Sequence, residues 1–162
     1  MKREELIKKY DAWIKGGFGT MAMLTVMNGI YVIRALIKKD LSLWLEFSMT
    51  EFAFKSTSYF NGYSGPFPLW AALIVVVGWS AALLFLAIKS IKRPMLLIPC
   101  TVLYAIDTAL LAFIMATDRF GDYGEASWIN VIVHVIMLTL FASGIYAAVK
   151  KKNLPEIETE EN

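Results

Sequence analysis

Residues 69–88 read LWAALIVVVGWSAALLFLAI, a run of 20 residues without a charged side chain. A helix of about 20 apolar residues is long enough to cross the roughly 30 Å hydrocarbon core of a bilayer. Three further runs have a similar length and character. The sequence therefore predicts an all-α integral membrane protein, with a four-transmembrane-helix bundle over residues 17–149 and spans at 17–36, 69–88, 95–116 and 128–149.

The composition of the whole chain agrees with a protein that is solvated by lipid. Of its 162 residues, 57% are apolar, and the mean hydropathy is +0.55. Soluble domains usually contain about 45–50% apolar residues even when glycine is included. A formal net charge of only +2 gives no reason to expect a nucleic acid as partner. The expected partners are the lipid bilayer and either a second copy of the chain or another membrane protein.

The single cysteine and the single histidine limit the chemistry that one chain can perform. Cys100 has no second cysteine to form an intrachain disulfide, and His134 has no second imidazole with which to share a metal. No phosphate-binding loop, nucleophile motif or cofactor signature is present. We therefore expect no catalytic residues, no metal site and no cofactor.

The distribution of lysine and arginine predicts the orientation of the spans. Eleven of these cations lie in the segments before the first span, between the second and third, and after the fourth, whereas five lie on the opposite side. Cytoplasmic loops carry the excess of positive charge in membrane proteins. The sequence thus predicts that both termini are cytoplasmic. The abundance of lysine and isoleucine and the absence of an N-glycosylation site favour the plasma membrane of a bacterium or archaeon.

Three segments outside the spans have distinct characters. Residues 41–54, LSLWLEFSMTEFAF, predict an amphipathic helix that lies in the outer membrane interface, although their alternating apolar residues also fit a strand. Residues 1–16 predict an amphipathic helix on the cytoplasmic surface. Residues 150–162 are acidic and contain a proline, which predicts a disordered cytoplasmic tail.

Three polar residues stand inside predicted spans at a similar depth in the outer half of the membrane: Asn28, Asp107 and His134. An ionisable side chain in a span costs about 2.5–3.5 kcal/mol on insertion scales, so it needs a specific reason to be there. We predict that Asp107 and His134 face each other with Asn28 alongside. This intramembrane polar cluster could join the helices by hydrogen bonds, or it could bind a proton, an ion or a ligand.

Four further residues are possible accessories of this cluster. Tyr31 and Tyr104 lie one helical turn from Asn28 and Asp107. Arg34 is near enough to the end of its span to serve as an interfacial anchor, and it would reach Asp107 only across about two turns. Glu51 interrupts the apolar face of the 41–54 segment, where it either faces the mouth of the bundle or ends the pattern.

Three functions from different classes are compatible with these features. The first is a non-enzymatic accessory or interaction component of a membrane complex, which we favour. The second is an oligomeric carrier or channel, coupled to a proton or an ion through Asp107. The third is a membrane enzyme that acts on a lipid-like substrate.

Overall fold

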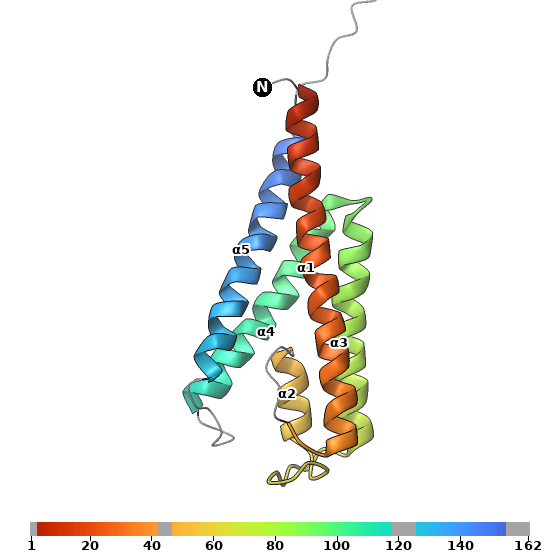
Figure 1. The fold of residues 1–162 in the computed structure, drawn as a ribbon, viewed down its shortest axis with the longest axis vertical. Coiled ribbons are helices and arrows are strands. Elements are labelled where there is room, and N and C mark those ends of the chain that lie inside the picture. The colour runs from red at the N-terminus through yellow and green to blue at the C-terminus, as the bar shows by residue number, and fades with distance from the viewer. Residues whose placement is uncertain (1–2, 42–46, 118–125, 155–162) are drawn as a thin grey trace, which may run out of the picture.

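The computed structural model describes residues 3–41, 47–117 and 126–154, the last range by its backbone alone over 126–129. These residues form helices joined by turns (Figure 1). In chain order the elements are α1 (Arg3–Lys38), α2 (Ser48–Lys55), α3 (Leu69–Ser90), the 3-10 helix η1 (Pro94–Leu96), α4 (Leu97–Thr117) and α5 (Ala126–Lys152).

Four helices are long and apolar enough to cross a membrane, namely α1, α3, α5 and the continuous unit of η1 and α4. Each contains one of the predicted spans, so the all-α architecture and the four apolar helices are confirmed. The last helix is longer than predicted and continues beyond Val149 through Lys150, Lys151 and Lys152. Cations in the last turn interact favourably with the negative end of the helix dipole. The predicted tail thus begins as helix, and its residues 155–162 lie outside the described part.

The predicted leader, residues 1–16, is continuous with the first span. One helix of 36 residues, α1, covers residues 3–16 of the leader and the whole first span, which corresponds to about 54 Å at 1.5 Å per residue. Glycines at 16, 17 and 19 suggest a break, yet α1 contacts α5 more extensively than it contacts any other helix, and Ile14 lies against Gly144 close to these glycines. Gly17 is buried against Leu97 and Phe141, where a larger side chain would meet its neighbours. The packing therefore outweighs the low helix propensity of glycine. A glycine inside a helix is about 1 kcal/mol less favourable than an alanine.

The bundle has two different ends. The N-terminus of α1, the C-terminus of α5 and the link between α3 and α4 lie at one end, which we call the terminal end (Figure 1). At the other end α2 is enclosed by the longer helices, and it contacts α3 and α4. The outward faces of the long helices carry large exposed apolar side chains, among them Ile74 and Phe85 on α3 and Ile132 on α5. This pattern is typical of helices that face lipid.

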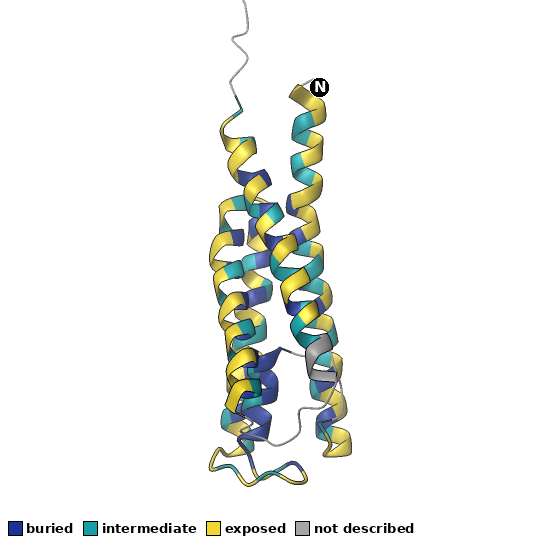
Figure 2. Cartoon of the chain, turned by 90° about the vertical axis from the view of Figure 1, so that its left-hand side faces the viewer, coloured by how far each residue is buried: buried dark blue, intermediate teal, exposed yellow. Residues whose placement is uncertain are grey.

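The short helix α2 differs from the predicted interfacial helix over residues 41–54. It begins at Ser48 and ends at Lys55, and residues 42–46 lie outside the described part. Six of its eight residues are buried, as Figure 2 shows. Its apolar side chains, such as Phe54, pack in a core cluster with Tyr31 of α1 and Val76 of α3. Its polar side chains are also enclosed, and Thr50 has no exposed surface. An eight-residue helix of this kind lies within the bundle because its apolar side chains pack against α1 and α3, while Glu51 and Lys55 pair with each other.

The loop after α2 folds back tightly on the end of that helix. The backbone N–H of Phe67 donates a hydrogen bond to the carbonyl of Ser56 at 3.0 Å, and Thr57 forms an isolated β-bridge with Phe67. Gly65 passes so close to Ser56 that a methyl group in its place would lie 1.9 Å from the Ser56 carbonyl oxygen. Only glycine fits this approach. The loop thereby returns the chain to the start of α3.

Candidate functional site

The first backbone amides of α2 bind side chains from two other helices. The N–H of Ser48 donates to Asp107 Oδ2 at 2.8 Å, and the N–H of Met49 donates to Asp107 Oδ1 at 2.9 Å. The N–H of Phe47, the residue before the helix, donates to Asn28 Oδ1 at 3.0 Å. The first N–H groups of a helix have no partner within the helix, and a nearby Ser, Thr, Asp or Asn usually caps them. Phe47 offers no capping side chain, so the cap of α2 comes from α1 and α4.

This arrangement provides hydrogen-bond partners both for a buried carboxylate and for the buried N–H groups at the start of α2. Asp107 has no exposed surface, and a carboxylate without hydrogen-bond donors in such a place would be costly. The start of a helix carries partial positive charge and unpaired N–H groups, which stabilise an anion. Buried N–H groups at the start of α2 also need acceptors. The carboxylate and the helix start therefore satisfy each other.

His134 of α5 joins the same network. Its Nδ1 lies 2.8 Å from the carbonyl oxygen of Asn130. A carbonyl only accepts, so Nδ1 carries a proton. Its Nε2 lies 3.3 Å from Asp107 Oδ2 and 3.3 Å from Ser48 Oγ. Neutral His134 can accept a hydrogen bond from the Ser48 hydroxyl at Nε2, and the imidazolium form can donate one to Asp107 Oδ2.

Tyr104 fixes the plane of the imidazole. Its ring stacks on the His134 ring, with the centroids 5.2 Å apart and the planes 7° from parallel. The edges of Phe47 and Phe141 complete an aromatic enclosure, with centroids 6.4 and 5.3 Å from that of Tyr104. Tyr104 is 1% exposed and His134 is 5% exposed. The histidine thus has a fixed orientation in an environment of low polarity, which strengthens its polar contacts.

The network reaches the remaining long helix through Asn28. The Nδ2 group of Asn28 donates to Ser80 Oγ of α3 at 3.0 Å. Asn28, Ser80, Asp107 and His134 come from α1, α3, α4 and α5, and the start of α2 lies between them. We call these four residues together with Phe47, Ser48 and Met49 the polar junction. The junction connects every α-helix of the described structure.

The structure brings together the three residues that the sequence places at one depth, and it adds partners that we did not predict. Ser80 carries the one hydroxyl group in the otherwise apolar span 69–88. This is the sequence feature from which its role as a hydrogen-bond partner could have been predicted. The backbone amides of α2 give no sequence signal, because every residue except proline has one.

The other predicted accessories occupy different surroundings. Tyr31 is buried in the cluster beside Phe54, with ring centroids 6.5 Å apart. Glu51 forms an ion pair with Lys55 at 2.9 Å, and both side chains are nearly buried. Arg34 is exposed on α1, where it lines a shallow groove with isoleucines. Tyr104 contacts the junction through the stacking of its ring on His134.

The chemical capacity of the junction follows from these contacts. Both Asp107 oxygens accept hydrogen bonds, and His134 uses both ring nitrogens. Within the described ranges, no three His, Cys, Asp or Glu side chains lie together as metal ligands. The junction can hold helices together and can bind a proton between Nε2 and Oδ2.

Comparisons of the chain with protein-family models, with curated proteins and with solved structures gave no match.

We predict that Asp107 and His134 are energetically coupled. Asp107→Asn replaces one carboxylate oxygen by an NH₂ group, which cannot accept the hydrogen bond from an α2 amide. It should lower the free energy of unfolding in detergent by about 1.5–3 kcal/mol. His134→Gln should lower it by about 1 kcal/mol. The double variant should lose at least about 0.5 kcal/mol less than the sum of the single losses, because contacting residues are not additive.

The control for this cycle is Thr139→Ala, which changes an exposed hydroxyl on α5 that bonds only within its own helix. Combined with Asp107→Asn, it should give an additive loss. Additivity in the Asp107 and His134 pair as well would contradict the direct contact.

Proposed function

We propose that the protein is a non-enzymatic membrane protein that binds another membrane component and acts as an accessory or interaction part of a membrane complex. The observation that carries the proposal is that the hydrogen bonds of Asp107 are used within the fold. Its carboxylate is fully buried and holds α2 through two backbone amides. A carboxylate used in this way stabilises the fold and is itself shielded from a substrate. Function then depends on the outer surface of the bundle.

One part of that surface is shaped for a neighbouring helix. Gly78 and Ala82 lie one turn apart on the exposed side of α3. A methyl group added at Gly78 would meet no atom within 4 Å, so the space above it is open. Ile74 and Phe85 flank this ridge and are 65% and 59% exposed. Small residues at this spacing let helix backbones approach closely in a membrane. The α3 ridge of Gly78 and Ala82 is thus our candidate contact surface.

A second candidate function is proton-coupled transport, and the His134 and Asp107 contact favours it. An imidazole 3.3 Å from a buried carboxylate can take up and release a proton inside the membrane. The two functions make opposite predictions for Asp107→Asn. A structural role predicts lower stability with partner binding and ion flux otherwise unchanged, whereas a carrier predicts a folded protein without flux.

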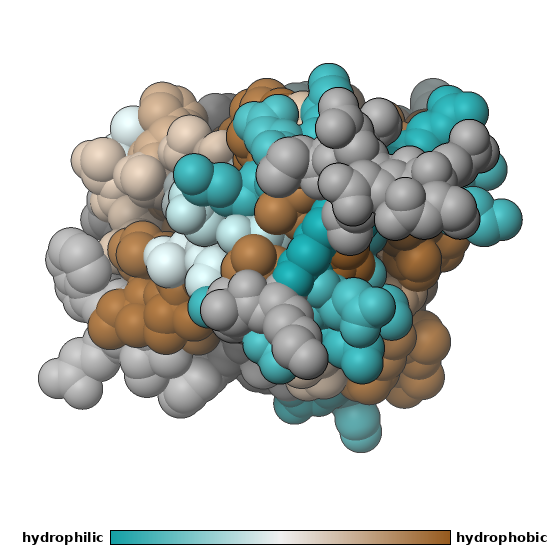
Figure 3. Space-filling model, turned by 90° about the horizontal axis from the view of Figure 1, so that it is seen from above, coloured by the Kyte–Doolittle hydropathy of each residue, from teal (hydrophilic) through white to brown (hydrophobic). Residues whose placement is uncertain are grey.

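We further propose that both termini face the cytoplasm of a bacterial or archaeal plasma membrane. The excess of lysine and arginine supports this orientation. The arrangement of the helices supports it as well, because the start of α1, the end of α5 and the basic α3–α4 link gather at the terminal end. Figure 3 shows hydrophilic side chains over that end and apolar ones at its margin.

The α3 ridge gives the test of the interaction function. In the tagged protein purified from its native membrane in mild detergent, Gly78→Leu with Ala82→Leu should abolish stoichiometric association with a partner or with a second copy. Because the space at Gly78 is open and Ala82 is exposed, we expect these changes to leave the stability of the single chain unaltered. Size-exclusion chromatography with light scattering measures the mass of the complex.

The matched control is Ala105→Leu with Ala109→Leu, two exposed alanines at the same spacing on α4. This control should leave the complex intact. A wild-type protein that purifies alone, or equal losses in both double variants, would contradict the α3 ridge as the contact surface.

The orientation is tested with single cysteines in a Cys100→Ser background. A cysteine at Ser64, in the loop before α3, should react with a membrane-impermeant maleimide added to intact cells. A cysteine at Asn153, just after α5, should react only after the membrane has been opened. Labelling of Asn153 from outside would reverse the proposed orientation.

A further inference from the structure

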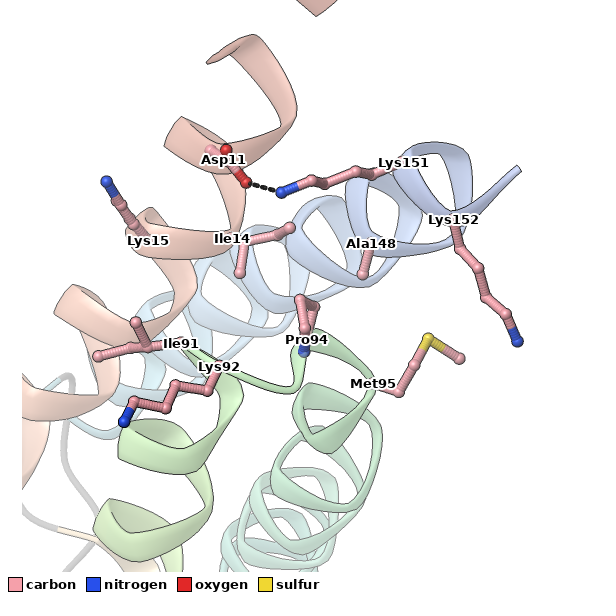
Figure 4. Close-up of a pocket in the computed structure, with 10 residues that line it drawn as sticks. All are labelled: Asp11, Ile14, Lys15, Ile91, Lys92, Pro94, Met95, Ala148, Lys151 and Lys152. Atoms are coloured by element: carbon pink, nitrogen blue, oxygen red, sulfur yellow. Dashed lines mark hydrogen bonds and ion pairs between the residues drawn. The ribbon is translucent and has the colours of Figure 1, made fainter. Parts of the chain in front are cut away.

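A cavity opens at the terminal end of the bundle, away from the end that encloses α2. It lies between the first part of α1, the α3–α4 link and the end of α5, and its volume is about 390 Å³. This volume falls in the range of about 300–1,000 Å³ that is usual for small-molecule sites. Figure 4 shows the residues that line it and the ion pair that crosses its top.

The lining of this cavity is strongly basic. Four lysines from three separate segments contribute to it: Lys15, Lys92, Lys151 and Lys152. Among the described residues that line the cavity, Asp11 is the acidic one, and it binds Lys151. In Figure 4 the ammonium groups of Lys15 and Lys92 lie on one side of the lining and that of Lys152 on the other, and all three side chains extend outward. The lining therefore carries a net positive charge that complements an anion.

The ion pair between Asp11 and Lys151 also shapes the cavity. It joins α1 to α5 near the ends of both helices. Ile14 and Ala148 are buried beneath it and belong to one core cluster with Leu97. The floor of the cavity is consequently apolar and fixed, while its rim consists of long, flexible cations. This combination can accept a charged group that is attached to an apolar body.

A second groove adjoins the cavity and shares one lysine with it. Lys92 lines both, and the groove of about 350 Å³ continues along Phe85, Leu96, Lys89 and Arg93. Phe85 is 59% exposed on the apolar outer face of α3. The basic rim thus passes directly into an apolar surface on the membrane-facing side of the bundle.

We propose that the terminal-end cavity binds the headgroup of an anionic phospholipid. The exposed side chains of Lys15, Lys92 and Lys152 turn inward to reach the phosphate, and the acyl chains follow the groove beside Phe85 and Leu96. A soluble phosphate would satisfy the cations but would leave this groove uncovered. Basic pockets between membrane helices at a membrane surface are suited to such headgroups, and each cation near an anionic lipid surface contributes about a fivefold gain in affinity.

The experiment compares two triple variants of the full chain in a zwitterionic detergent. The first, Lys15→Gln/Lys92→Gln/Lys152→Gln, removes the three rim cations. The matched control, Lys8→Gln/Lys9→Gln/Lys150→Gln, removes three exposed lysines from α1 and α5 at the same end but outside the cavity. Native mass spectrometry measures the binding of dioleoyl phosphatidylglycerol, dioleoyl phosphatidylcholine and inorganic phosphate. Thermal unfolding without added lipid checks that both variants fold, since all six side chains are exposed.

The wild-type protein should bind phosphatidylglycerol in preference to phosphatidylcholine. The rim variant should lose about 100-fold in affinity, as three fivefold contributions imply, and the control should lose less than about fivefold. Equal losses in the two variants would show that the attraction is diffuse and would overturn the site. Equal binding of phosphatidylcholine, or full competition by inorganic phosphate, would overturn the assignment to an anionic lipid.

Discussion

The buried carboxylate of Asp107 at the start of α2 is the contact on which the rest of the structure depends. A short helix enclosed in a bundle brings unpaired N–H groups into an apolar environment, and a buried carboxylate brings an unpaired charge. The burial of either group alone is unfavourable. Together they form hydrogen bonds, because the amides of Ser48 and Met49 donate to the two carboxylate oxygens. Asn28 and His134 extend the contact to α1 and α5.

This junction separates the molecule into parts with different roles. At the end that encloses α2, polar contacts and the tight loop at Gly65 fix the path of the chain. At the terminal end, α1 and α5 pack together and form a basic cavity. Between them, the outer faces of the helices are apolar and open to lipid or to a partner. The proposed interaction surface and the proposed lipid site therefore contain no residue of the junction. The junction contributes to them only by holding the helices in place.

Much of the architecture could be predicted from the sequence, because a span needs only length and low polarity. The common depth of Asn28, Asp107 and His134 also indicated a meeting point. The partner of Asp107 could not be predicted, since backbone amides carry no side-chain signal and α2 is too short to be recognised as an enclosed helix. Composition suggested a boundary near Gly17, where the packing of α1 against α5 instead maintains one helix.

The most direct test of this account is hydrogen exchange at the backbone amides of Phe47–Thr50, followed by mass spectrometry in wild type and in Asp107→Leu. Loss of both acceptors should accelerate exchange in this segment by at least about tenfold, because each hydrogen bond to a charged group contributes about 1.5–3 kcal/mol. Exchange at Ala147–Lys152, at the terminal end, should stay unchanged. An Asp107→Leu protein that remains folded and exchanges Phe47–Thr50 at the wild-type rate would contradict the claim that Asp107 holds α2 in the bundle.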